Sequence, residues 1–257
     1  SAFNNAGITL FTDGLAHPWV ATNWLVHWVI TVLVFLGALG MVAIFDLFDL
    51  RKLRERMVQP WKTISFPAKI ALYFSVILVV LGTLAFAALE WNGTLAGMSG
   101  FGKFTTAVFQ SVTRTSGFNT VDIGAVGMPM LFLLLVLMFI GASSSSTGGG
   151  IKTSTLAIVL ADVWRTVRGG DHVQIFKRTV SAVLRSRAYS VLLFFLVGNL
   201  VGVFVLTVTE SALVNSGAST FFDLAFEHVS AMGTVGLSTG ITPILSSGGK
   251  VVLAVAM

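Results

Sequence analysis

The chain has 257 residues, of which 55% are hydrophobic and 11% are charged. Soluble domains carry about 25% charged residues, so this composition excludes an ordinary soluble protein and indicates a chain that lies in a lipid bilayer. The formal net charge is +5 and there is no cysteine, which excludes disulfides and cysteine-ligated metals.

In chain order, three apolar runs are long enough to cross a membrane as helices: residues 24–45, 68–89 and 188–209. Twenty-two residues make about 33 Å of helix, and the hydrocarbon core is about 30 Å thick. We therefore predict an all-α membrane protein. His27 lies in the first run near Trp24 and Trp28, which is typical of an interfacial aromatic belt.

Twelve of the 16 basic residues fall in two connections between these runs, residues 51–69 and 165–187. Cytoplasmic loops of membrane proteins are enriched in Lys and Arg, so both connections are predicted to be cytoplasmic. The net charge then has a topological explanation, and we predict no nucleic-acid partner. The same basic runs could also bind anionic membrane lipid or a cytosolic subunit.

A repeat appears when three segments are aligned on their glycines: SAFNNAGIT from Ser1, SVTRTSGFN from Ser111 and SAMGTVGLS from Ser230. In each, a serine stands six residues before the glycine and a hydrophobic residue follows it. Short amphipathic stretches, residues 103–112 and 219–231, precede two of the glycines and are long enough to reach only halfway through a membrane.

The repeating unit is thus an outer helix, a half-length pore helix, a glycine-bearing loop and an inner helix. We divide the chain into residues 1–50 (second unit, loop and inner helix), 51–166 (third unit, with a broken inner helix) and 167–257 (fourth unit, cut short). A first unit is expected upstream. Four such units around one axis give the pseudo-fourfold pore of a potassium-channel-like fold.

The chemistry of this unit follows from its backbone. A half-helix directs its negative end into the membrane, and glycine permits the positive φ that turns successive carbonyls toward one axis. Rings of carbonyls replace the water shell of an alkali cation. The repeat therefore predicts a cation selectivity filter, with its loops facing outside.

The stretch GASSSSTGGGIKTST, Gly141 to Thr155, interrupts apolar sequence on both sides. A phosphate-binding loop requires glycine directly before lysine, but Ile151 separates Gly150 from Lys152, so nucleotide hydrolysis is rejected and no enzyme is predicted. The stretch instead predicts a break in the third inner helix. Lys152 either places its charge near the conduction path or extends to the cytoplasmic interface.

NNAG, TRTSGFNT and SAMGTVGLSTG resemble the second, third and fourth filter segments of the Trk/Ktr/HKT superfamily of potassium transporters, and STGGGIK resembles their third-unit gate loop. The resemblance covers the whole chain and is closest to the KtrB branch. It implies one pore per chain, a homodimer in the cell membrane and a cytosolic, nucleotide-binding KtrA/TrkA-like regulatory ring. No organic cofactor is implied for this chain.

Carried over by position, the resemblance assigns the residues whose backbone carbonyls bind potassium. These are Asn5, Ala6, Gly7, Thr115, Ser116, Gly117, Thr234, Val235 and Gly236. It also assigns the intramembrane gate loop. That loop contains Gly141, Ser143, Ser144, Ser145, Ser146, Thr147, Gly148, Gly149, Gly150 and Lys152.

Four alternatives remain open at this stage. A sodium-permeable or sodium-coupled transporter would share this architecture, since the first filter unit, where serine in place of glycine is associated with sodium permeation in the family, is not in the chain. An alternating-access transporter also uses broken helices, although inverted halves would be expected. A purely structural membrane subunit would leave the aligned glycines unexplained. The fourth alternative is that the aligned glycines only permit close packing where helices cross.

Overall fold

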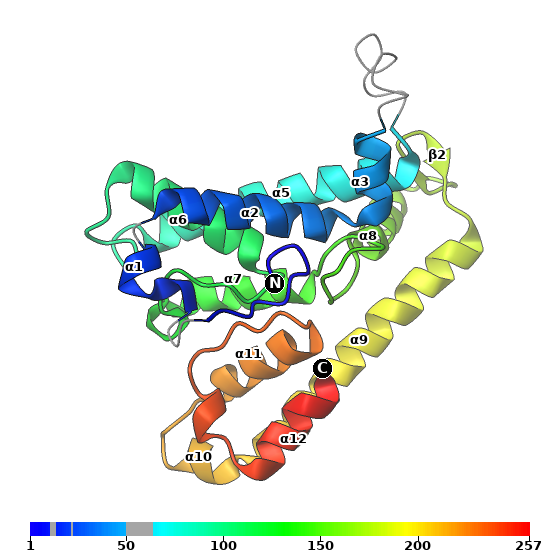
Figure 1. The fold of residues 1–257 in the computed structure, drawn as a ribbon. Coiled ribbons are helices and arrows are strands. Elements are labelled where there is room, and N and C mark those ends of the chain that lie inside the picture. Colours follow the sequence, from blue (N-terminus) through cyan, green and yellow to red (C-terminus); the bar gives the residue numbers. More distant parts are fainter. Residues whose placement is uncertain (11–13, 22, 50–63) are drawn as a thin grey trace.

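The computed structural model describes residues 1–10, 14–21, 23–49 and 64–257, so most of the basic connection 51–69 lies outside the described residues. The helices α2, α5, α6 and α7 run side by side, and the long helix α9 crosses to a second group formed with α11 and α12 (Figure 1). The prediction of an all-α fold built from apolar helices is confirmed.

The second unit contains a 3-10 turn η1 (Gly14–Ala16), the one-turn helix α1 (Pro18–Ala21) and the inner helix in two pieces, α2 (Trp24–Leu39) and α3 (Met41–Leu47). The two pieces meet at 105°. The apolar run 24–45 is therefore divided between two helices and is not one continuous helix. The break lies at Gly40, whose φ of 84° is a conformation that glycine adopts without a steric penalty.

The third unit is complete in the described region. The outer helix α5 (Phe66–Glu90) is followed by the pore helix α6 (Gly100–Thr113), the 3-10 turn η2 (Ile123–Ala125) and the inner helix in two pieces, α7 (Met128–Phe139) and α8 (Thr153–Arg168). With 14 residues, α6 is about 21 Å long, too short to cross a bilayer. The predicted break between the two pieces is present.

The fourth unit begins after a small hairpin of β1 (Gln174–Ile175) and β2 (Arg178–Thr179). The outer helix α9 (Ala182–Thr209) leads through α10 (Ser211–Asn215) to the pore helix α11 (Phe221–Met232), η3 (Thr242–Ile244) and α12 (Ser247–Ala256). A capping box of Thr220 and Asp223 begins α11.

Two helices of the described region, α5 and α9, are long and apolar enough to cross a membrane, and the bent pair α2–α3 would make a third. In each complete outer helix, a glutamate at or just past the C-terminal end binds the start of the following inner helix. Glu90 Oε1 accepts a hydrogen bond from the Gly127 amide at 2.9 Å, and Glu210 accepts one from the Ser246 amide at 3.1 Å. The repeat is therefore visible in side-chain contacts as well as in helix order.

The largest core joins the third and fourth units. It packs Phe86 of α5, Met138 of α7 and Phe226 of α11 against Val235, which lies in the fourth glycine turn. Removing such side chains from water supplies about 25 cal/mol for each Å² of apolar surface in a soluble protein, whereas in lipid the close packing itself holds the helices together. The glycine turns are thus attached to the best-packed part of the molecule.

His27 is fully buried beside Phe109 of the pore helix, with a ring-centroid distance of 5.3 Å. The interpretation of His27 as part of an interfacial belt is therefore wrong. The face of α2 that carries His27 packs on α6, because His27 and Thr31 are four residues apart and share the buried side of the helix.

Candidate functional site

The three glycine turns, which are 110 and 119 residues apart in the sequence, lie against one another. A Cβ atom added to Gly7 would collide with the carbonyl oxygen of Ser116, and one added to Gly117 would lie 3.0 Å from the carbonyl carbon of Gly236. Backbone meets backbone at both contacts, so only glycine fits. The structure thus brings the predicted second, third and fourth segments together.

Positive φ angles recur in these turns. Gly7, Gly117 and Gly236 have φ values of 64°, 73° and 92°, and Asn5 and Thr234 both have a φ of 50°. A β-branched residue such as threonine rarely adopts this conformation, which costs about 1–3 kcal/mol and is found mainly where the surroundings impose it at functional sites.

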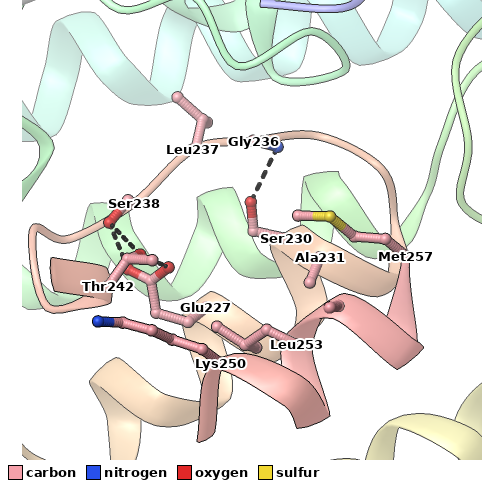
Figure 2. A pocket seen from close by; sticks show the side chains of 11 residues that line it. Glu227, Ser230, Ala231, Gly236, Leu237, Ser238, Thr242, Lys250, Leu253 and Met257 are labelled. Carbon is pink, nitrogen blue, oxygen red and sulfur yellow. Dashed lines mark hydrogen bonds between the residues drawn. The ribbon is translucent and has the colours of Figure 1, made fainter. Parts of the chain in front are cut away.

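The third and fourth turns are held by hydrogen bonds to their own pore helices. The amide of Gly117 donates to the Thr113 carbonyl at 3.1 Å. In the fourth unit, the amide of Gly236 donates to Ser230 Oγ at 3.1 Å (Figure 2), and the amide of Val235 donates to the Ser230 carbonyl at 2.8 Å. The serine six residues before the glycine therefore has a structural role in this unit.

Glu227 anchors the segment that follows the fourth turn. Its carboxylate accepts hydrogen bonds from Ser238 Oγ at 2.6 Å, the Thr239 amide at 3.0 Å and Thr242 Oγ1 at 2.7 Å. Figure 2 shows these side chains converging beside a cavity of about 330 Å³ that Lys250 also lines. Sequence reasoning gave Glu227 no definite role. The available signal was an acidic residue in the middle of a short half-helix.

The loop between α7 and α8 closes on itself at its base. The amide of Gly141 donates to the Ile151 carbonyl at 3.0 Å, and the amide of Ile151 donates to the Phe139 carbonyl at 3.1 Å. The backbone of Gly141 is in direct contact with that of Gly149 and Gly150. The glycines at the two ends of the loop therefore permit the close approach that closes it.

The same loop lies against the first residue of each glycine turn. Asn5 Nδ2 donates to Thr147 Oγ1 at 2.8 Å, and a Cβ on Gly148 would lie 3.7 Å from the Thr115 carbonyl oxygen. A side chain on Gly149 would collide with Thr234 Oγ1. The predicted gate loop and the predicted filter residues therefore form one cluster.

The tip of the loop binds the broken end of α2. Ser143 donates from its amide to the Ala38 carbonyl at 3.0 Å and from Oγ to the Leu39 carbonyl at 2.9 Å, and the amide of Met41 donates to the Ser145 carbonyl at 3.1 Å. A helix break leaves backbone groups without partners, and the loop supplies those partners here. Sequence reasoning missed this contact.

The remaining serines of the loop bond within it or to the start of α8. Ser144 Oγ lies 2.5 Å from Ser154 Oγ, and the Ser146 amide donates to the Ser143 carbonyl at 3.2 Å. Lys152 is half-buried, and its ammonium folds back onto the Gly148 carbonyl. Its charge is therefore held at the loop and does not extend away from it.

Arg114 directly precedes the third glycine turn and is only 4% exposed. Its Nη1 donates to the carbonyls of Leu137, at 2.6 Å, and Ile140, which are freed because α7 ends at Phe139. A cation at a helix C-terminus interacts favourably with the helix dipole. Arg114 thus stands at the end of its own pore helix, but the helix end that its side chain binds is that of α7.

Comparison with known proteins gives the chain a family. A family model described as "TrkH: Cation transport protein" matches residues 1–257. The chain is 36% identical over 262 residues to Ktr system potassium uptake protein B of Bacillus subtilis, covering 100% of this chain and 55% of that protein. It is 35% identical to the potassium/sodium uptake protein NtpJ of Enterococcus hirae, covering 98% of this chain and 54% of that protein.

Among solved structures, the potassium transporter TrkH from Vibrio parahaemolyticus has a TM-score of 0.77 and 16% sequence identity, with 100% of this chain and 53% of that chain covered. The chain thus spans about half the length of the relatives it matches, and the structural match supports the fold. The resemblance found in the motifs is confirmed. The chain belongs to the TrkH family of cation transport proteins, membrane transporters and not enzymes.

Proposed function

We propose that the protein containing this chain takes up potassium across the cell membrane through a filter formed by the glycine turns. The observation that carries the proposal is the contact of three turns with Gly7, Gly117 and Gly236 at positive φ, of which the third and fourth each follow a half-length pore helix. Such turns direct backbone carbonyls at a shared axis, where they replace the hydration shell of the ion.

The gate in this proposal is the loop from Gly141 to Lys152. The loop contacts Asn5, Thr115 and Thr234, and the ammonium of Lys152 is bound to the Gly148 carbonyl. A loop in this place obstructs an ion leaving the filter, and a positive charge held on it repels cations. Opening then requires that the tip of the loop leaves α2 and that the Lys152 ammonium moves.

Potassium is favoured by the three glycines, each in a filter turn. The second candidate is a sodium-permeable transporter, which is favoured by one specific observation: the relative from Enterococcus hirae is named a potassium/sodium uptake protein. An alternating-access mechanism is less well supported, since the visible units repeat in the same sense along the chain with matching helix order.

We also propose that the protein works as a homodimer with a cytosolic, nucleotide-binding regulatory ring of the KtrA/TrkA kind. The Ktr system named in two relatives supports the regulatory partner. In this arrangement the connections 51–69 and 165–187 face the cytoplasm and the filter loops face outside. The division into units ending at residues 50, 166 and 257 belongs to the same proposal.

The test is ion uptake by the intact protein in a potassium-starved bacterium that lacks its own uptake systems. Growth at low potassium, with rubidium or potassium influx that excess sodium does not abolish, is the expected result. Sodium that outcompetes potassium would replace the potassium assignment with the sodium one. Absence of either flux in a well-expressed membrane protein would overturn the proposal.

A further inference from the structure

An open groove of about 640 Å³ lies between α5, α8 and the β1–β2 hairpin, away from the glycine turns and the gate loop. Its walls are mainly apolar and aromatic. They include Tyr73, Phe74, Leu160, Trp164 and Phe176. Tyr73 is 50%, Leu160 49% and Trp164 58% exposed, so large apolar side chains stand unprotected here.

The groove has a firm floor. Ile70 of α5, Ala157 of α8 and Ile175 of β1 are buried in one small core under it. On one side, Tyr73 and Phe176 meet edge to face, with ring centroids 5.8 Å apart. The hairpin is thus packed against α5, which fixes this wall of the groove.

Three basic residues lie along the rim. The Arg168 guanidinium stacks over the ring of Trp164 at 4.4 Å, the Arg178 guanidinium lies 5.6 Å from the ring centre of Phe66, and Lys177 occupies the hairpin turn with a φ of 63°. The carboxylate of nearby Asp162 pairs with Arg165 and Arg185. No described carboxylate forms an ion pair with the three rim residues.

The groove also continues into an exposed apolar surface of α5. Tyr73 begins a row of exposed apolar residues along α5, one of the two helices long enough to span a membrane. The row continues with Val76, Val80 and Leu84. An acyl chain could follow this row from the groove into the hydrocarbon core. A folded cytosolic partner could not, because the row lies within the spanning helix.

We propose that this groove binds an anionic phospholipid, with an acyl chain against Tyr73, Leu160 and Trp164 and the phosphate held by Arg168, Lys177 and Arg178. Basic residues beside an apolar surface at the membrane boundary attract anionic headgroups, and aromatic side chains prefer that depth. The proposal requires that the chain lies in a membrane but does not depend on which ion the protein transports.

This site is connected to the loop by the chain itself. α8 begins at Thr153, directly after the gate loop, and its far end carries Trp164 and Arg168. A lipid between α8 and α5 would fix the position of α8 relative to the outer helix. Occupancy of the groove would then change how readily the loop moves.

The test uses the full-length protein in nanodiscs of phosphatidylcholine containing a dibrominated phosphatidylglycerol, because bromine on an acyl chain quenches nearby tryptophan. The quenching of Trp164 is obtained as the difference in tryptophan fluorescence quenching between the protein and its W164F variant. We expect brominated phosphatidylglycerol to quench Trp164 at a lower mole fraction than brominated phosphatidylcholine. Equal quenching by the two lipids would overturn the assigned headgroup contact.

Two variants and one control separate the parts of the site. R168Q/K177Q/R178Q should weaken the phosphatidylglycerol preference by roughly fivefold for each charge removed. A161F, which fills the groove, should reduce quenching by both lipids. K103Q/K250Q, which neutralises basic residues remote from the groove, should leave the phosphatidylglycerol preference unchanged. If the triple variant keeps its lipid preference but no longer binds the cytosolic subunit, this surface is a protein-docking face and the lipid proposal fails.

Discussion

The glycine turns and the gate loop are both irregular backbone, yet they are held in opposite ways. The amide of Gly117 bonds four residues back to Thr113, and that of Gly236 bonds six residues back to Ser230. Ser143 of the gate loop instead bonds to Leu39, 104 residues away, and Thr147 binds Asn5, 142 residues away. The third and fourth turns are fixed by their own pore helices, whereas the loop is closed at its base by its own bonds but is held at its tip by another unit.

The difference suits a fixed filter beside a movable barrier. Local bonds to a buried pore helix cannot be lost without unfolding that helix. Contacts between units can be exchanged when the units shift by small distances, because packed interfaces have discrete alternative arrangements.

Gly117→Ala should have the largest effect, because the new methyl group would collide with the Val235 carbonyl oxygen and approach the Gly236 backbone. The collision is with backbone and not with a movable side chain, so we expect uptake to fall by about tenfold or more. The positive φ adds a cost of about 1–3 kcal/mol that alanine pays at any such position. The measurement is potassium influx in cells. Gly97→Ala is the matched control, since Gly97 has a φ of 79° with nothing within 4 Å. Equal losses in the two variants would contradict the contact between turns.

Arg114→Gln should come next, because it removes the cation that serves the carbonyls of Leu137 and Ile140. Leaving buried polar groups unpaired costs about 1–3 kcal/mol each, so we expect a lower melting temperature and a loosened loop. The chain has no cysteine, so S145C introduced into it is a defined target for a thiol reagent. Its labelling should accelerate in the Arg114→Gln background and stay unchanged with Lys103→Gln. An unaltered labelling rate would separate Arg114 from the loop.

Glu227→Gln should affect ion discrimination more than stability, because Glu227 orients Ser238, Thr239 and Thr242 next to the fourth turn. Hydrogen bonds to a charged group are worth about 1.5–3 kcal/mol, and the amide keeps the shape while losing the charge. We expect a severalfold lower ratio of potassium to sodium influx. Glu90→Gln, at the helix–helix contact with Gly127, should lower the melting temperature with the ratio unchanged. The reverse pattern would contradict the role given to Glu227.

Ser143→Ala should have the smallest effect, because it removes one hydrogen bond to the Leu39 carbonyl, worth about 1 kcal/mol. The bias toward the closed loop would weaken by about fivefold, and basal flux should rise by up to that factor. Ser146→Ala is the control, since its hydroxyl makes only a 3.5 Å contact within the loop. Equal fluxes in the two variants would mean that the bond to α2 does not restrain the loop.

The sequence was sufficient for the features that depend on local chemistry. Hydropathy located α5 and α9, the aligned glycines located the turns, and the small residues of 141–150 located the break between α7 and α8. The bend at Gly40 could not be predicted, because an isolated glycine in an apolar helix is ordinary in membranes. Its φ is dictated by the approach of Ser144 and Ser145 from another unit.

Side-chain partners were the other gap. Arg114 binds a carbonyl at the end of α7, so its partner depends on where α7 stops. Glu227 binds the segment after Gly236, so its partners depend on how that segment folds back. Such contacts join residues that no periodic pattern connects. The repeat gave the positions of the elements, and the three-dimensional packing determined which polar groups meet.

The most direct test of the account is deletion of residues 143–149 from the full-length protein, followed by measurement of potassium flux in vesicles without the regulatory subunit. We expect a higher flux with the preference for potassium over sodium retained, because the obstruction is removed while the locally held turns remain. Unchanged or lower flux through a deletion protein that folds and assembles normally would contradict it.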